Sequence, residues 1–313
     1  MRHLLFLVTI VLVFIGGYSA ADAEPRAALV IGNAAYQFAP ALKNTVNDAT
    51  SISEALKSAG FDVRVASNLK RAEMDRVLRE FLAQAASLGN QATALIFYAG
   101  QGVQIDGDDY LVPIDAKIER EADVLFQAVP LSTVLTGVSG LPVATRIVIL
   151  DTSRSNPFPT TGPVGAVPQV PAGTIVAFST SPGGDADEGE GANSPFTAAF
   201  VEAIKEPGLR IEQAFQKIRQ KVTKDTDGRQ IPQEISSLPA PFSFFAAAAE
   251  TLAQPATSAP AQADGAAARR DYELALEVNT KEAWEAFLQL YPSGFHATLA
   301  RARLNRLSTA GAN

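Results

Sequence analysis

Two segments change abruptly from apolar to small, polar residues, and chemistry is expected there. The apolar run Thr93–Tyr98 leads into Ala-Gly-Gln-Gly at 99–102, and the run Arg146–Leu150 leads into Asp-Thr-Ser-Arg-Ser at 151–155. Ligands of open parallel sheets bind beyond the carboxyl ends of the strands. If both runs are strands of such a sheet, the glutamine, serines and acidic residue that follow them are candidates for a site.

The composition limits the chemistry available at these residues. The 313 residues include no cysteine, and the two histidines are His3 and His296. Thiolate nucleophiles and disulfides are therefore excluded. The hydroxyl of Ser153 is a weak nucleophile without an adjacent base, and the amide of Gln101 does not titrate near neutral pH. His296 lies near the C-terminus, so a histidine base is not expected beside Ser153.

Charge and hydrophobicity narrow the class of protein. The chain has 26 Lys and Arg against 33 Asp and Glu, a net charge of −7, and it is 47% hydrophobic. Nucleic-acid binders normally present a basic face, so this balance argues against one. The apolar content is high enough for a folded domain with a sizeable core.

The N-terminus has the three parts of a secretory signal peptide. A basic start at 1–3 precedes the apolar run Leu4–Ile15, and Ala21-Asp22-Ala23 is a small-x-small cleavage signal. This pattern predicts removal of residues 1–23 and export to a periplasm or to the medium, with no membrane attachment afterwards. An uncleaved membrane anchor is the alternative, although the apolar run is short for a spanning helix.

The mature chain alternates between strand and helix patterns up to about residue 245. Apolar runs predict strands over 26–31, 61–66, 93–98, 146–150, 174–178 and 242–245. Between them, Thr45–Asp48 is typical of a capping box, Asn68 and Ser194 are candidate helix caps, and Asp106-Gly107 predicts a hairpin turn. Strands alternating with helices predict an α/β fold with a mainly parallel, doubly covered sheet.

The last part of the chain has a different pattern. Residues 246–268 are rich in Ala, Pro and Gln, which predicts a linker. From 269 to 313, helical stripes contain Trp284 and Phe287, and Thr280 is a candidate cap. This predicts a small helical module similar to one tetratricopeptide-like helix pair. A helical appendage packed on the main domain is the alternative.

Several motifs in order resemble those of caspase-like proteins of the bacterial metacaspase or orthocaspase kind, with a p20-like domain. The matching stretches are Ala-Leu-Val-Ile-Gly-Asn at 28–33, Leu-Lys-Asn-Thr-Val-Asn-Asp-Ala at 42–49, Phe-Tyr-Ala-Gly-Gln-Gly at 97–102, Tyr-Leu-Val-Pro-Ile-Asp at 110–115, Val-Ile-Leu-Asp at 148–151 and Asn-Ser-Pro-Phe-Thr at 193–197. The resemblance implies a three-layer sandwich with a mainly parallel sheet of about six strands over residues 24–245.

The chain departs from this family at the positions that carry its chemistry. The resemblance places Gln101 where the family has its catalytic histidine, and Ser153 where it has its cysteine. It also implies that Asp48 and Asp151 form an acidic pocket for an Arg or Lys side chain. Two alternatives stay open, since Asp48 suits a helix cap and Asp151 suits a bond to the amides of its own loop. Ser155 stands where many relatives have an acid.

These features predict an exported caspase-like pseudoprotease that binds peptides or partner proteins, with Arg or Lys side chains, without cutting them. One alternative is an active endopeptidase that uses Ser153, and another is a structural adaptor that acts through the C-terminal helices. No cofactor is expected apart from a calcium ion at the acidic loop 185–191, for which a solvated surface loop is the alternative. The sequence shows no zinc cluster and no phosphate loop.

Overall fold

The computed structural model describes residues 24–158, 168–246, 265–292 and 295–310. The chain divides into two units, residues 1–248 and 249–313, and each is described by itself. The predicted signal peptide, 1–23, and most of the predicted linker lie outside the described residues. Within the described ranges, no helix is both long and apolar enough to span a bilayer.

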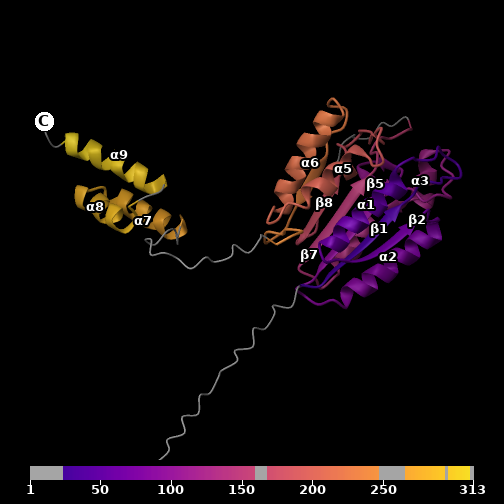
Figure 1. The fold of residues 1–313 in the computed structure, drawn as a ribbon, viewed down its shortest axis with the longest axis horizontal. Helices are drawn as coiled ribbons and strands as arrows, with labels where there is room; N and C mark the ends of the chain where they lie inside the picture. Colours follow the sequence, from indigo (N-terminus) through magenta and orange to yellow (C-terminus); the bar gives the residue numbers. More distant parts are fainter. Residues whose placement is uncertain (1–23, 159–167, 247–264, 293–294, 311–313) are drawn as a thin grey trace, which may run out of the picture. The chain divides into compact units, whose positions relative to one another are not determined.

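The first unit is built on a mixed sheet of six strands in the order β2-β1-β3-β7-β8-β9 (Figure 1). Its first five strands are mutually parallel, and β9 pairs antiparallel with β8. The predicted α/β fold with a mainly parallel sheet is confirmed. The strands are β1 (Arg26–Gly32), β2 (Asp62–Ser67), β3 (Thr93–Ala99), β7 (Thr145–Asp151), β8 (Thr174–Phe178) and β9 (Gln233–Ser236).

Helices cover both faces of this sheet, which makes three layers. Helices α1 (Thr45–Ser58), α5 (Pro195–Ala203) and α6 (Ile211–Asp225) share one apolar core with the sheet. Helices α2 (Arg71–Ala86) and α4 (Leu131–Ser139) share a second core with the opposite face.

The central strands explain why continuous apolar runs predicted them correctly. In β1, Ala28 and Val30 face the first core, whereas Leu29 and Ile31 face the second. Side chains of a strand alternate between the two faces, so a strand covered on both sides needs apolar residues at every position.

A second, small sheet lies next to the carboxyl end of β3. It has the order β4-β5-β6, from β4 (Gly102–Ile105), β5 (Asp108–Leu111) and β6 (Val129–Pro130). Asp106 and Gly107 connect the first two strands with φ values of 50° and 85°. Both lie in the left-handed region that a two-residue hairpin turn requires, so the predicted hairpin is confirmed. Helix α3 (Glu121–Gln127) contributes Val124 to the core beneath this sheet.

The predicted last strand over 242–245 is wrong. That segment makes a single bridge, between Arg210 and Ser243, and the edge of the sheet is β9 instead. Phe242 and Phe244 are buried in the first core, where their rings meet edge to face at 5.2 Å. Their apolar character therefore comes from side-chain packing, not from a place in the sheet.

The predicted cap at Asn68 is also wrong. Helix α2 starts at Arg71, and Asn68 has a left-handed φ of 53° just before it. Its side-chain oxygen accepts the backbone N–H groups of Ala34 and Ala35, at 2.9 Å each. Asn68 thus holds the loop that follows β1.

The second unit contains α7 (Gly265–Val278), α8 (Lys281–Leu290) and α9 (Phe295–Ala310). Helix α7 starts at Gly265, within the stretch predicted as linker. The predicted cap is confirmed, because the Thr280 hydroxyl accepts the N–H of Ala283. Trp284 is fully buried and packs with Phe287 in a small core.

Candidate functional site

A pocket of about 480 Å³ lies where β1, β3 and β7 end and is the candidate site. Gln101, Ser153, Asp48 and Asp151, the four residues singled out from the sequence, all line it, and so does Ser155. They come from the end of β7, the loops after β3 and β7, and the first turn of α1. The parallel sheet therefore brings together residues that are far apart along the chain.

Gln101 is tied to the loop after β1. Its side-chain amide donates a hydrogen bond to the carbonyl of Pro40 at 2.9 Å, and its backbone N–H donates to the hydroxyl of Tyr36 at 2.6 Å. A carboxamide has neither the proton nor the basic nitrogen that general acid–base catalysis needs near neutral pH. Gln101 acts here as a link between two loops of the pocket.

Ser153 receives a hydrogen bond rather than giving up its proton. Its Oγ accepts the backbone N–H of Ala186 at 2.9 Å. In the hydrogen bonds of the described ranges, no carboxylate or imidazole accepts the Ser153 proton. An amide N–H cannot remove a proton, so this contact does not activate the hydroxyl as a nucleophile.

Two tyrosines behind the pocket do not supply the missing base. The Tyr98 hydroxyl lies 2.9 Å from the carbonyls of Gln101 and Val112 and 3.3 Å from the hydroxyl of Tyr36. Burial raises the pKa of Tyr36 to about 12 and that of Tyr98 well above its ordinary value. Both phenols are therefore neutral near pH 7, and they hold the turn after β3 in place.

Asp151, the last residue of β7, is buried and bonded to the start of α5. Its Oδ2 accepts the hydroxyls of Ser194, at 2.5 Å, and Thr197, at 2.9 Å. The alternative role, a bond to the amides of its own loop, is therefore not the one that the structure shows. As predicted, Ser194 also caps α5, because its side chain accepts the N–H of Thr197, and Pro195 occupies the first turn.

Asp48 is 1% exposed and binds the same segment. Its Oδ1 accepts the side-chain amide of Asn193 at 3.0 Å and the backbone N–H of Ser194 at 2.9 Å. The predicted capping box is wrong, because Asn44 is the N-cap and makes no side-chain cap bond. The Thr45 hydroxyl donates instead to the carbonyl of Asn33.

Ser194 thus connects the two carboxyl groups, through its N–H to Asp48 and its hydroxyl to Asp151. Sequence reasoning assigned Ser194 only to a helix cap and did not single out Asn193. The available signal was the Asn-Ser-Pro-Phe-Thr stretch at 193–197, which carried part of the family resemblance.

The two carboxyl groups are close enough to affect each other's protonation. Burial, followed by the charge of Asp151, raises the pKa of Asp48 to about 7, and burial raises the pKa of Asp151. In the described ranges, no Lys or Arg forms an ion pair with either of them. Two like charges in a buried site favour keeping a proton or accepting a cationic ligand.

The acidic loop 185–191 forms one rim of the pocket. Asp185 accepts the hydroxyl of Ser155 at 2.6 Å, Glu188 accepts the backbone N–H of Lys43 at 2.8 Å, and Asp187 pairs with Arg229. Part of its charge is therefore used in protein contacts. In the described ranges, no group of three or more His, Cys, Asp or Glu side chains is placed to hold a metal ion.

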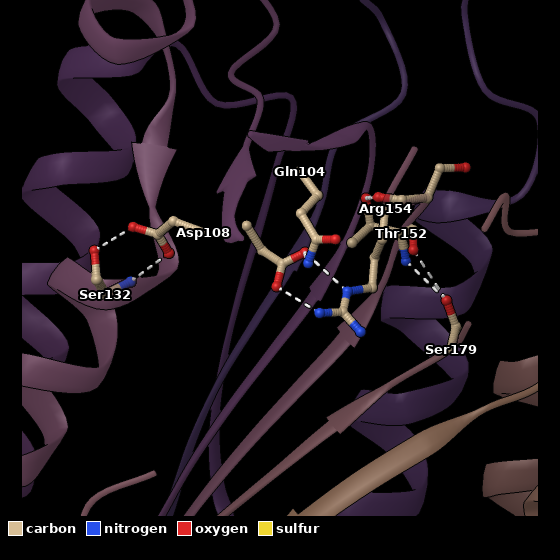
Figure 2. Close-up of polar contacts among 8 residues, drawn as sticks. Gln104, Asp108, Ser132, Thr152, Arg154 and Ser179 are labelled. Atoms are coloured by element: carbon tan, nitrogen blue, oxygen red, sulfur yellow. Dashed lines mark hydrogen bonds and ion pairs between the residues drawn. The ribbon is translucent and has the colours of Figure 1, made fainter. Parts of the chain in front are cut away.

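A buried ion pair fixes the pocket segment that carries Ser153. Arg154 donates two hydrogen bonds to Asp109 on β5, at 2.8 and 2.9 Å, and Gln104 lies beside this pair (Figure 2). The guanidinium carbon of Arg154 also lies 3.8 Å from the ring centroid of Phe178. The segment that carries Ser153 is thereby fixed to the small sheet. The sequence alone indicated no partner for Arg154.

A second pair of contacts fixes the same segment to the main sheet. The N–H of Thr152 donates to the hydroxyl of Ser179 at 3.0 Å, and that hydroxyl lies 3.2 Å from the Thr152 carbonyl (Figure 2). Ser179 directly follows β8. The residues before and after Ser153 are thus both held by buried polar contacts.

Comparisons with known proteins agree with this architecture. Caspase-1 from Spodoptera frugiperda has a similar fold, with a TM-score of 0.55 and 18% sequence identity over 71% of this chain and 92% of that chain. The human mucosa-associated lymphoid tissue lymphoma translocation protein 1 is 26% identical over 167 residues, which is 53% of this chain. Its mouse homolog is also 26% identical over 167 residues.

The short alignments limit which properties of these relatives can be compared with this chain. The aligned region is 20% of the human protein and 19% of the mouse protein, so this chain corresponds to a small part of either. The family model described as caspase domain matches residues 25–243, which cover the first unit and the pocket. The chain therefore belongs to the caspase-domain family.

Proposed function

We propose that this caspase domain is a pseudoprotease that binds peptides or proteins through an Arg or Lys side chain and does not cleave them. One observation carries the proposal. Asp48 and Asp151 line a pocket without a cationic partner in the described ranges, whereas Ser153, in the same pocket, has no base bonded to it. Carboxylates bind guanidinium and ammonium groups through charge-assisted hydrogen bonds.

The geometry of the two acids supports this ligand class. The bonds to Asp48 from Asn193 and Ser194 both end on Oδ1, and those to Asp151 from Ser194 and Thr197 both end on Oδ2. Asp48 keeps a second oxygen with lone pairs to offer, whereas the Asp151 carboxyl also has Ser179 as a hydrogen-bond partner. An Arg fork with several N–H donors matches such an arrangement.

The binding test uses the full chain and a capped peptide, acetyl-Arg-Gly-amide, in isothermal titration calorimetry. We expect saturable binding that Asp48→Asn weakens at least tenfold at pH 8. Asp227→Asn, at an exposed turn outside the pocket, is the matched control and should bind like the natural protein. Equal binding by natural protein and Asp48→Asn, or none by either, contradicts the proposal and favours an adaptor that acts through the C-terminal helices.

The cleavage test uses fluorogenic peptides with Arg or Lys before the reporter group, with and without calcium. We expect no turnover above that of Ser153→Ala. Reproducible turnover that Ser153→Ala abolishes would replace the pseudoprotease by an active endopeptidase.

Export is part of the same proposal. The basic start, apolar run and Ala-Asp-Ala signal within residues 1–23 support it. We expect protein from its native host to begin near Glu24 by intact-mass measurement and to be found outside the cytoplasm. A retained Met1 in the membrane fraction would favour the uncleaved anchor.

A further inference from the structure

We propose that the pocket recognises two neighbouring side chains of a peptide at once, a cationic one and a large apolar one. The first contacts the acid end of the pocket, defined here as Asp48 and Asp151. The second contacts the apolar end, defined as Phe38, Ile118 and Phe158, which line the same pocket. This inference rests on the proposed function and specifies which peptides satisfy it.

The two ends are built from different parts of the fold. The acid end is bonded to residues 193–197, at the start of α5. At the apolar end, Ile118 and Phe158 pack against the core of the small sheet, to which the pocket residue Val103 also belongs. The pocket therefore extends from the first helix layer to the small sheet.

One segment of the chain, the end of β7 and the residues that follow it, contributes to both ends of the pocket. Asp151 belongs to the acid end and Phe158 to the apolar end, and Ser153 and Ser155 also line the pocket. A peptide lying along this segment places consecutive side chains at chemically different ends.

The volume and the charges of the lining fit such a ligand. At about 480 Å³ the pocket falls within the range of about 300–1,000 Å³ typical of sites for whole small ligands, so one side chain does not define its contents. All charged side chains of the described lining are acidic, namely Asp48, Asp151, Asp185, Asp187 and Glu188. Charge complementarity thus selects cationic ligands and excludes anionic ones.

The apolar end has exposed apolar surface that a bound ligand would cover. Phe38 is 57% exposed although it is a large aromatic residue, and Ile118 and Phe158 are partly exposed. Covering such surface is favourable in proportion to the apolar area removed from water. A ligand with only a cationic group leaves this apolar surface exposed to water. Adding a Phe side chain to the ligand should therefore raise its affinity about tenfold.

The experiment compares capped dipeptides on the full chain by isothermal titration calorimetry at pH 8. Acetyl-Arg-Phe-amide and acetyl-Phe-Arg-amide test both orders of the two side chains, and acetyl-Arg-Gly-amide and acetyl-Gly-Phe-amide each lack one of them. We expect the better of the first two to bind about tenfold more tightly than acetyl-Arg-Gly-amide. The acetyl-Gly-Phe-amide peptide should bind most weakly.

Phe38→Ala tests whether the apolar end causes the tighter binding of the peptide that has both side chains. It should remove most of the advantage of the peptide with both side chains, and circular dichroism checks that the variant is folded. The matched control is Phe126→Ala, an aromatic residue on α3 that is 80% exposed and outside the pocket lining, which should keep the full advantage.

The other possible results contradict either the two-ended site or the proposed function. If acetyl-Arg-Gly-amide binds as tightly as both peptides with Arg and Phe, the two-ended site is wrong while the proposed function stands. The same holds if Phe38→Ala and Phe126→Ala behave alike. If no Arg peptide binds, or if acetyl-Gly-Phe-amide binds best, the proposed function itself fails.

Discussion

At the scale of single residues, two replacements decide the chemistry of the pocket. The family resemblance assigns a histidine to position 101 and a cysteine to position 153, where this chain has Gln101 and Ser153. A nucleophile and its base act as a unit, so the loss of either removes most of the rate. The structure adds that Gln101 is bonded to Pro40 and Ser153 to Ala186, so both side chains have acquired other contacts.

The first prediction restores the pair. Gln101→His combined with Ser153→Cys should give weak cleavage after Arg or Lys, sensitive to thiol reagents, whereas each single variant should show none. The activity should be partial, because a misplacement near 1 Å costs about 100-fold. Peptide hydrolysis by the three variants measures this, with folding checked by circular dichroism. A folded but inactive double variant would mean that more than the pair has been lost.

The second prediction concerns Asp48 and the pH dependence of stability. Its pKa of about 7 in the folded protein exceeds the ordinary value of 3.8, so folding favours the protonated carboxyl. The free energy of unfolding should therefore fall as pH rises from about 4 to about 7. Asp48→Asn keeps an oxygen acceptor for Asn193 and Ser194 but carries no charge, so it should remove the part of this fall that Asp48 causes.

Urea unfolding at pH 5 and pH 8 measures this effect. At pH 8, Asp48→Asn should be more stable than the natural protein by about 1–3 kcal/mol, since each tenfold change in proton affinity corresponds to about 1.4 kcal/mol. The control Asp227→Asn, at an exposed turn, should follow the natural protein at both pH values. A natural protein that gains stability between pH 5 and pH 8 relative to Asp48→Asn would show that the carboxyl is stabilised, not destabilised, by its surroundings.

At the scale of elements, the buried pair of Arg154 and Asp109 joins the segment after β7 to β5. Burial raises the pKa of Asp109, and the hydrogen bonds and charge of Arg154 oppose that rise. Such pairs add little net stability, but removing one partner leaves a buried charge alone. Their main effect here is to fix where the pocket segment lies.

The third prediction follows from this contact. Asp109→Asn should lower the free energy of unfolding by about 3–5 kcal/mol, because Arg154 stays buried without its counter-charge. The matched control is Glu80→Gln, which breaks exposed pairs with Arg64 and Arg76 and should lower the free energy of unfolding far less. Urea unfolding of both variants gives the comparison. Equal costs would show that the buried pair is as loosely held as the surface pairs.

Among the elements of the sheet, the central strands could be predicted from the sequence, whereas the edge strand β9 could not. Strands β1, β3, β7 and β8 were predictable because both of their faces are buried, which leaves a continuous apolar run. Strand β9 was not, because it is a four-residue edge strand with no buried residue. The apolar segment at 242–245 was the stronger pattern but belongs to the core.

The sequence predicted which residues line the candidate site but not the contacts that these residues make. Family motifs pointed to Asp48 and Asp151, whereas local pattern alone fitted Asp48 equally well as a helix cap. The deciding bond comes from Ser194, which is 146 residues further along the chain. The Arg154–Asp109 pair spans 45 residues. Contacts at such separations depend on the tertiary fold and leave no periodic signal in one sequence.

At the scale of the whole molecule, two units of very different core size share one chain. In the described ranges, the second unit has five buried apolar residues, Ala275, Trp284, Phe287, Ala297 and Ala300. The first unit has two large cores, one on each face of its sheet. Small domains bury a smaller fraction of their surface and are correspondingly marginal. We therefore expect the helical module to unfold before the caspase domain.

The fourth prediction uses a built-in reporter to test this order. Trp284 is the single tryptophan of the chain and is fully buried in the second unit. Tryptophan fluorescence should therefore follow the module, whereas far-UV circular dichroism is dominated by the larger domain. In urea we expect the fluorescence transition at a lower midpoint than the main dichroism transition. Asp109→Asn should shift only the dichroism transition, because its contact lies in the first unit. Coincident transitions that shift together in this variant would show that the two units unfold as one cooperative structure.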